Sequence, residues 1–112
     1  MTEEFKQEIT KRLTKELLDI QLLRLIDAEN VWGYKIKKTF EKDFGIKLRH
    51  GALYPTLNQL EQKGLLSSSI QKQNGRKRKT YSLTSKGRKY LEDYYLVLKE
   101  QLTAQKTYIN SQ

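Results

Sequence analysis

Apolar residues recur at helical spacing along most of this 112-residue chain, which predicts a largely helical single domain. Near the N-terminus the apolar residues form one row, which consists of Phe5, Ile9 and Leu13. Thr2 precedes this row and can cap a helix. From residue 14 to about residue 28 they cover more than one face, so this segment should be largely buried. The pattern leaves open whether residues 1–28 form one helix or two.

A buried row of Ile36, Phe40 and Phe44 predicts the next helix, and Gly45 follows it as a left-handed helix stop. Trp32 precedes this helix and has two interpretations. It can line a ligand pocket or pack onto the helix as a staple, and the staple is favoured.

The following helix combines a buried row, Leu53, Leu57 and Leu60, with an unusual outer face. Pro55 fits only the first turn of a helix, which favours a start near Tyr54. A start at His50 or Gly51 would place the proline just past the free amides. The outer face carries no acid and no large aliphatic residue, and consists of Gly51, Pro55, Asn58, Gln59 and Gln62. Asn and Gln can pair with adenine edges, so this face suits DNA readout, although a solvated face is the simpler interpretation of this helix alone.

Two extended segments, residues 66–73 and 78–83, flank Asn74-Gly75, the strongest short-range signal of a β-hairpin. Partial alternation of Ile70, Tyr81 and Leu83 predicts one packed face. The tip is expected to carry four adjacent cations, with Lys72 nearby: Arg76, Lys77, Arg78 and Lys79. Such a loop has two interpretations. Its cations are simply solvated, or a bound anion relieves the repulsion between them.

A long terminal helix is predicted after Thr84, which can cap it. Its apolar row is longer than a domain of this size needs, so we expect a dimer interface; packing within the same chain is the alternative. The residues assigned to the interface come from both ends of the chain and are Phe5, Ile9, Leu13, Leu91, Tyr94, Tyr95, Leu98 and Leu102.

The net charge of +9 is localised. Between Gln62 and Leu91 there are nine bases and no acid, while the rest of the chain balances 13 bases against 13 acids. A concentrated positive field of this kind attracts a polyanion, and nucleic acid is the usual one.

Composition excludes several function classes. The chain has no cysteine and a single histidine, so it can build no disulfide, no thiolate metal site and no metal site made of several histidines. It contains no Walker loop, dinucleotide fingerprint or nucleophile elbow. No apolar run approaches the roughly 20 residues that cross a bilayer. We therefore expect a soluble, cytoplasmic protein that is not an enzyme and needs no cofactor, metal or membrane.

Four motifs resemble the PadR family of winged-helix transcriptional regulators, over roughly residues 14 to 102. They are Gly33-Tyr34-x-Ile36, Gly51-Ala52-Leu53-Tyr54-Pro55-x-Leu57, Leu60-Glu61-x-x-Gly64-Leu65 and Arg78-Lys79-x-Tyr81-x-Leu83-Thr84-x-x-Gly87. Two departures matter. Trp32 stands where family members commonly have His. The terminal helix also lacks the Trp with which multidrug-sensing members hold planar ligands, so a small-molecule effector is unsupported.

The resemblance implies a fold that is mainly α with a small β-hairpin wing, a winged helix-turn-helix whose N- and C-terminal helices form a dimer interface. The corresponding division is an N-terminal helix for dimer contact (1–13), a winged-helix DNA-binding domain (14–83) and a dimerisation helix (84–112). In such a homodimer the third helices enter successive major grooves of double-stranded DNA, and the wings reach flanking minor grooves or phosphates.

The residues expected to face DNA are His50, Gly51, Tyr54, Pro55, Asn58 and Gln59 on the helix, and Lys72, Arg76, Lys77, Arg78 and Lys79 on the wing. Tyr54 is implied to reach phosphate; His50 either contacts phosphate or is simply exposed. We expect a sequence-specific regulator, a repressor that occupies a pseudo-palindromic operator. The alternatives are a sequence-neutral architectural nucleic-acid binder and a winged-helix protein–protein adaptor.

Overall fold

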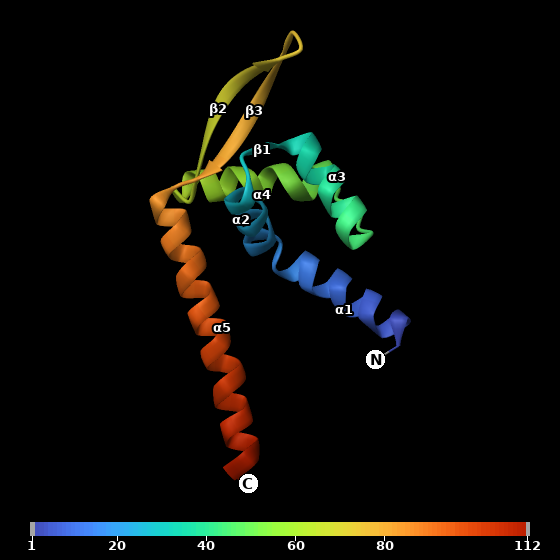
Figure 1. Cartoon of the computed structure of the whole chain (residues 1–112), viewed down its shortest axis with the longest axis vertical. Helices are drawn as coiled ribbons and strands as arrows, with labels where there is room; N and C mark the ends of the chain where they lie inside the picture. Colours follow the sequence, from blue (N-terminus) through green and yellow to red (C-terminus); the bar gives the residue numbers. More distant parts are fainter. Residues whose placement is uncertain (1, 112) are drawn as a thin grey trace.

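The computed structural model describes the backbone of residues 2–111 and the side chains of residues 2–72 and 74–104. Along the chain the elements are α1 (Glu3–Glu16), α2 (Leu18–Ala28), β1 (Val31–Trp32), α3 (Gly33–Phe44), α4 (His50–Gln62), β2 (Leu66–Gln73), β3 (Arg76–Leu83) and α5 (Ser85–Ser111) (Figure 1). The predicted fold class, mainly α with a small β-hairpin wing, is confirmed.

Residues 1–28 contain two helices rather than one. Thr2 caps α1 as predicted, and the Phe5 amide donates to its Oγ1 at 3.2 Å. Leu17 interrupts the helix with φ −111° and ψ 34°, outside the helical region. The break lets α2 turn into the core, where Leu22, Leu23 and Ile26 are buried, while α1 leads away from it (Figure 1).

The hairpin turns at Asn74 and Gly75, both at positive φ (51° and 77°), as a two-residue type I′ turn requires. β3 begins at Arg76, two residues earlier than predicted. It is the central strand of a three-stranded antiparallel sheet in the order β1-β3-β2, with Trp32 opposite Thr80. β1 was not predicted, because two residues are too few to show alternation.

The core lies between α2, α3, α4 and the base of the sheet. The predicted rows of α3 and α4 are confirmed in part: Ile36, Phe40, Leu53, Leu57 and Leu60 are buried. Phe44 is 42% exposed in the last turn of α3, in contact with the Phe40 ring. Ile70 is 64% exposed, because the hairpin extends beyond the helices that cover its base (Figure 1). The prediction that these two residues are buried was wrong.

α4 begins at His50, so the start near Tyr54 that the proline favoured is wrong. The amides of Ala52 and Leu53 both donate to the Arg49 carbonyl at 3.0 Å and close the first turn. Pro55 is therefore the sixth residue of the helix and leaves the Gly51 carbonyl without its usual donor. Burial of Leu53 and part of Tyr54 against the core offsets that loss.

The two terminal helices project from this core on the side opposite the hairpin (Figure 1). The radius of gyration, 16.6 Å, exceeds the roughly 13 Å of a compact chain of about this length. None of the helices in residues 2–111 is long and apolar enough to cross a membrane.

Candidate nucleic-acid interface

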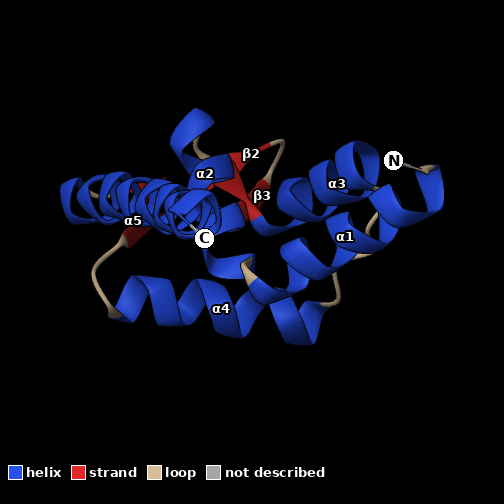
Figure 2. Cartoon of the chain, turned by 90° about the horizontal axis from the view of Figure 1, so that it is seen from below, coloured by secondary structure: helices blue, strands red, loops and turns tan. Residues whose placement is uncertain are grey.

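The outer face of α4 is uncovered. Gly51, Pro55, Asn58, Gln59 and Gln62 are all exposed, on the side opposite the buried row. Figure 2 shows α4 along one side of the molecule, with no other element over its outer surface. The structure thus leaves a face of amides and small residues free to meet a ligand, and His50 is exposed at its first turn.

Tyr54 is half-buried at the edge of this face and connects α4 with the start of α3. Its ring stacks against His50, with centroids 4.2 Å apart, and Lys37 Nζ lies 5.5 Å from its centroid. A Cβ built on Gly33 would lie 2.2 Å from Tyr54 Oη, so any larger residue at that position would have to displace the Tyr54 ring. Packing against Gly33 holds the Tyr54 hydroxyl beside the outer face of α4.

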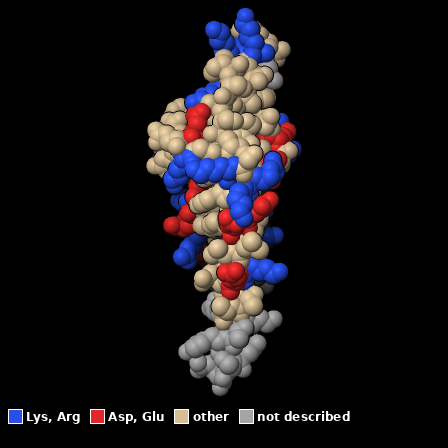
Figure 3. All heavy atoms as spheres, turned by 90° about the vertical axis from the view of Figure 1, so that its left-hand side faces the viewer, with Lys and Arg blue, Asp and Glu red and all other residues tan. Residues whose placement is uncertain are grey.

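The wing cations do not form one cluster on the turn, as the sequence had suggested. Arg76, Lys77, Arg78 and Lys79 all belong to β3, so their side chains alternate between the two faces of the hairpin. Lys72 stands directly opposite Lys77. Like charges in that position destabilise a strand pair, and a bound anion would relieve the repulsion. Figure 3 shows basic side chains gathered at the far end of the hairpin.

Lys79 reaches back to α4 instead of pointing outward. Its Nζ lies 3.2 Å from Glu61 Oε1, and the Ser68 hydroxyl donates to the other carboxylate oxygen. The Ser68 hydrogen bond and the Lys79 ammonium hold the pKa of Glu61 below its ordinary value; the same contact, with Tyr81, raises the pKa of Lys79. Sequence reasoning missed Glu61 as a link between wing and helix, although it lies in the Leu-Glu-x-x-Gly-Leu motif.

A hollow of about 330 Å³ lies where β1, α4 and β3 meet. We call it the wing hollow; its lining residues are Trp32, Gly33, Tyr34, Tyr54, Asn58, Arg78, Lys79 and Tyr81. It brings Arg78 and Lys79 to the same place as Asn58, although the two segments are 20 residues apart. The Arg78 guanidinium carbon lies 4.9 Å from the centroid of the Trp32 ring. Trp32 therefore lines a hollow, and its assignment to a ligand pocket stays a prediction.

Most of the residues assigned to a dimer interface are uncovered in the single chain. Phe5, Ile9, Leu13, Tyr95, Leu98 and Leu102 are exposed. Leu91 is 4% exposed and belongs to the core of its own chain, and Tyr94 packs beside it, half-buried. Leu91 was wrongly assigned to a partner contact, because the first turns of α5 pack against α2 and only later turns extend beyond the body.

Among the side chains described here, no group of three Asp, Glu or His residues could hold a metal ion.

Comparison with known proteins places these features in a family. Residues 22–93 match the PadR family, described as the transcriptional regulator PadR-like family. That match begins within α2, ends in the first turns of α5 and therefore includes α4, the hairpin and the wing hollow. Among curated proteins, none is significantly similar in sequence.

Solved structures of similar proteins share the fold. A PadR-like transcription factor from Bacteroides fragilis is 27% identical, with a TM-score of 0.75 over 91% of this chain and 98% of that one. A PadR-like transcriptional regulator from Bacillus cereus is 25% identical, with a TM-score of 0.72 over 88% and 96%. A PadR family transcription regulator from Clostridium difficile is also 25% identical, with a TM-score of 0.70 over 81% and 96%.

Proposed function

Because this chain belongs to the PadR-like family of DNA-binding transcriptional regulators, we propose that it acts as a homodimer that represses transcription by occupying a pseudo-palindromic operator. The observation that carries this proposal is the outer face of α4, which is uncovered, free of acid and flanked by a cationic hairpin. We assign DNA binding to residues 14–83 and dimer contact to residues 1–13 and 84–112.

The helix and the hairpin have different tasks in this proposal. Asn58 and Gln59 discriminate bases, and a good bidentate contact is worth about 1–3 kcal/mol. Arg76 and Lys77, exposed along the hairpin, supply affinity for any sequence by releasing counterions from phosphates. Tyr54 reaches a phosphate beside the groove.

The dimer is supported by the terminal helices. α5 is 27 residues long, or roughly 40 Å, and leaves the body after its first turns (Figure 1). Leu96, Leu98 and Leu102 are 44–64% exposed on the described part of it. A helix with that much exposed apolar surface gains free energy by burying it, and the exposed row of α1 offers a matching surface in a second copy.

Selection of bound duplexes from a random pool, with the purified full chain, tests the function. The expected result is a pseudo-palindrome with half-sites about one helical turn, ~10 bp, apart. Salt-sensitive binding without enrichment of any sequence would mean a sequence-neutral binder, and no salt-sensitive binding at all would favour a protein adaptor. Either result overturns the proposal. Repression is tested by transcription in vitro from a promoter that overlaps the selected site; increased transcription would mean an activator.

Sedimentation equilibrium tests the dimer. The wild-type chain should have the mass of two copies, and Leu98→Glu should shift it toward one copy by burying a charge in the interface. Thr103→Glu is the matched control, because it adds the same charge at an exposed polar position about 140° around the same helix from Leu98, away from the assigned row. A wild-type monomer, or equal effects of the two substitutions, would contradict this part of the proposal.

A further inference from the structure

The wing hollow lies where a helix and a wing bound to one duplex must straddle a DNA strand. Major and minor grooves alternate along B-DNA, and one sugar–phosphate backbone separates adjacent grooves. If α4 lies in the major groove and the hairpin in the next minor groove, that backbone passes between them. The wing hollow has Tyr54 and Asn58 on the α4 side and Arg78 on the β3 side. This step rests on the proposed function.

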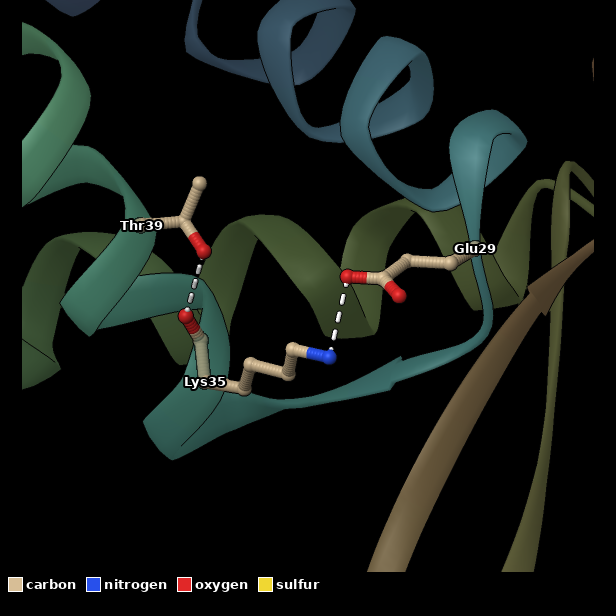
Figure 4. Close-up of polar contacts among 3 residues, drawn as sticks. All are labelled: Glu29, Lys35 and Thr39. Atoms are coloured by element: carbon tan, nitrogen blue, oxygen red, sulfur yellow. Dashed lines mark hydrogen bonds and ion pairs between the residues drawn. The ribbon is translucent and has the colours of Figure 1, made fainter.

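Two cations line the wing hollow, Arg78 and Lys79, and one of them already has an acid partner. Lys79 is paired with Glu61. Lys35 lies 5.6 Å from the Trp32 ring centroid, but its Nζ reaches back across β1 to Glu29 at 3.0 Å (Figure 4). Among the described residues, Arg78 forms no ion pair. Arg78 is thus the cation of the hollow whose charge remains available to an anion.

Two donors at this place are buried and lack an acceptor. Arg78 Nε and Trp32 Nε1 are both inaccessible to solvent and have no hydrogen-bond partner among the described residues. Burying a donor without an acceptor costs free energy, and more when the group is charged. Because these two atoms are inaccessible, an incoming phosphate would meet the terminal N–H groups of Arg78 instead.

The Trp32 ring restricts the Arg78 side chain. A guanidinium stacked on an indole face gains a cation–π contact and loses rotational freedom before any ligand binds. The remaining N–H groups of the Arg78 guanidinium lie in one plane, so two of them can donate side by side to two oxygens of a phosphate.

We propose that the wing hollow binds one phosphate of the DNA backbone that separates the two grooves. Arg78 is the residue that binds this phosphate, and Trp32 is the residue that positions Arg78. The phosphate is bound in the dimer once per protomer. Asn58 reads bases beside it, and the Glu61–Lys79 pair keeps the hairpin at the distance from α4 that the backbone requires.

A double-mutant cycle of Trp32 and Arg78 tests this assignment. It measures how tightly the full chain binds a labelled duplex that was selected from the random pool. Arg78→Ala should weaken binding about tenfold and flatten the salt dependence by about one ion per protomer. Trp32→Leu should produce most of the same loss, and the double variant should lose no more than Arg78→Ala alone. Trp32→Phe, which keeps a stacking ring, should bind within about twofold of wild type.

Lys77→Ala is the matched control, because Lys77 is a neighbouring wing cation outside the hollow. Its effect should add to that of Trp32→Leu. Losses from Trp32→Leu and Arg78→Ala that add fully would overturn the positioning role. If Trp32→Leu fails to fold, Arg78→Lys takes its place in the test, because lysine keeps the charge but lacks the planar guanidinium. Arg78→Lys should recover less than half of the affinity that Arg78→Ala loses. Full recovery would overturn the role of a positioned guanidinium.

Neutral methylphosphonates, placed one at a time in the duplex, identify the phosphate. Wild-type binding should weaken at one position per half-site, between the bases read by α4 and the minor groove met by the hairpin. Arg78→Ala should be insensitive at that position, whereas Lys77→Ala should remain sensitive. If Arg78→Ala stays sensitive to a methylphosphonate at that position, the phosphate site in the wing hollow is overturned. This holds even when wild-type selection of an operator upholds the proposed function.

Discussion

Replacing Gly33 by alanine tests whether its contact with Tyr54 sets the geometry of the interface. The added Cβ would lie 2.2 Å from Tyr54 Oη and 2.7 and 2.8 Å from two ring carbons, whereas ordinary contacts begin near 3.4 Å. The ring must therefore move by more than an ångström. Its inner side packs against the core, so the ring must leave its present place in the lining of the wing hollow.

The expected cost follows from these distances. Overpacking costs about 1–3 kcal/mol, and because Tyr54 is only half-buried we expect a loss in the free energy of unfolding of about 1–2 kcal/mol. Duplex affinity should also fall, by roughly 2- to 12-fold, the value of one hydrogen bond of about 0.5–1.5 kcal/mol. Urea unfolding measures the first quantity and fluorescence anisotropy with a labelled duplex the second.

Two comparisons make the test specific. Gly51→Ala is the same substitution in a neighbouring helix, but nothing lies within 4 Å of its Cβ, so it should leave stability unchanged or raise it by up to about 1 kcal/mol. In a Tyr54→Ala background the cost of Gly33→Ala should disappear. A Gly33→Ala variant as stable as wild type, or a cost that persists without the Tyr54 ring, would refute this reasoning.

Three further predictions concern the helix, the wing and the base of α5. Asn58→Ala should weaken operator binding more than binding to mixed-sequence DNA, whereas Arg76→Ala should weaken both alike; equal losses from Asn58→Ala would contradict a reading role. Because the pKa of Glu61 is lowered, its contacts stabilise the fold above its ordinary pKa and are lost as pH falls through the lowered value; Glu61→Gln should remove this acid sensitivity in melts across pH 3–6, and a variant that keeps it would contradict the assignment. Thr84 Oγ1 accepts from the Gly87 amide at 2.9 Å, so Thr84→Ala should cost about 1 kcal/mol in urea unfolding, and an unchanged midpoint would refute the cap.

The predictions that held depend on interactions between residues close in sequence. Thr2 and Thr84 cap their helices, and Gly45 ends α3 at φ 64° as expected. The Asn74-Gly75 turn forms the hairpin, because two consecutive residues at positive φ are met most readily by Asn and Gly. Helical spacing identified the buried row of α4, since residues three and four apart share a face whatever lies opposite.

The errors concern contacts between distant segments. Pro55 argued locally against a helix from His50, but burial against the core outweighed it. Phe44 and Ile70 have the spacing of buried residues, yet they lie where no other element covers them.

The sequence by itself determined the helices, the hairpin, the concentrated charge and the amide face of α4, because each follows from backbone preferences and periodicity along one segment. Only the tertiary structure decided that β1 pairs with β3, that Arg78 rests on Trp32, and that both lie beside Asn58. These contacts join residues 20 or more positions apart. Their formation depends on how the packed helices orient the sheet, which no local pattern encodes.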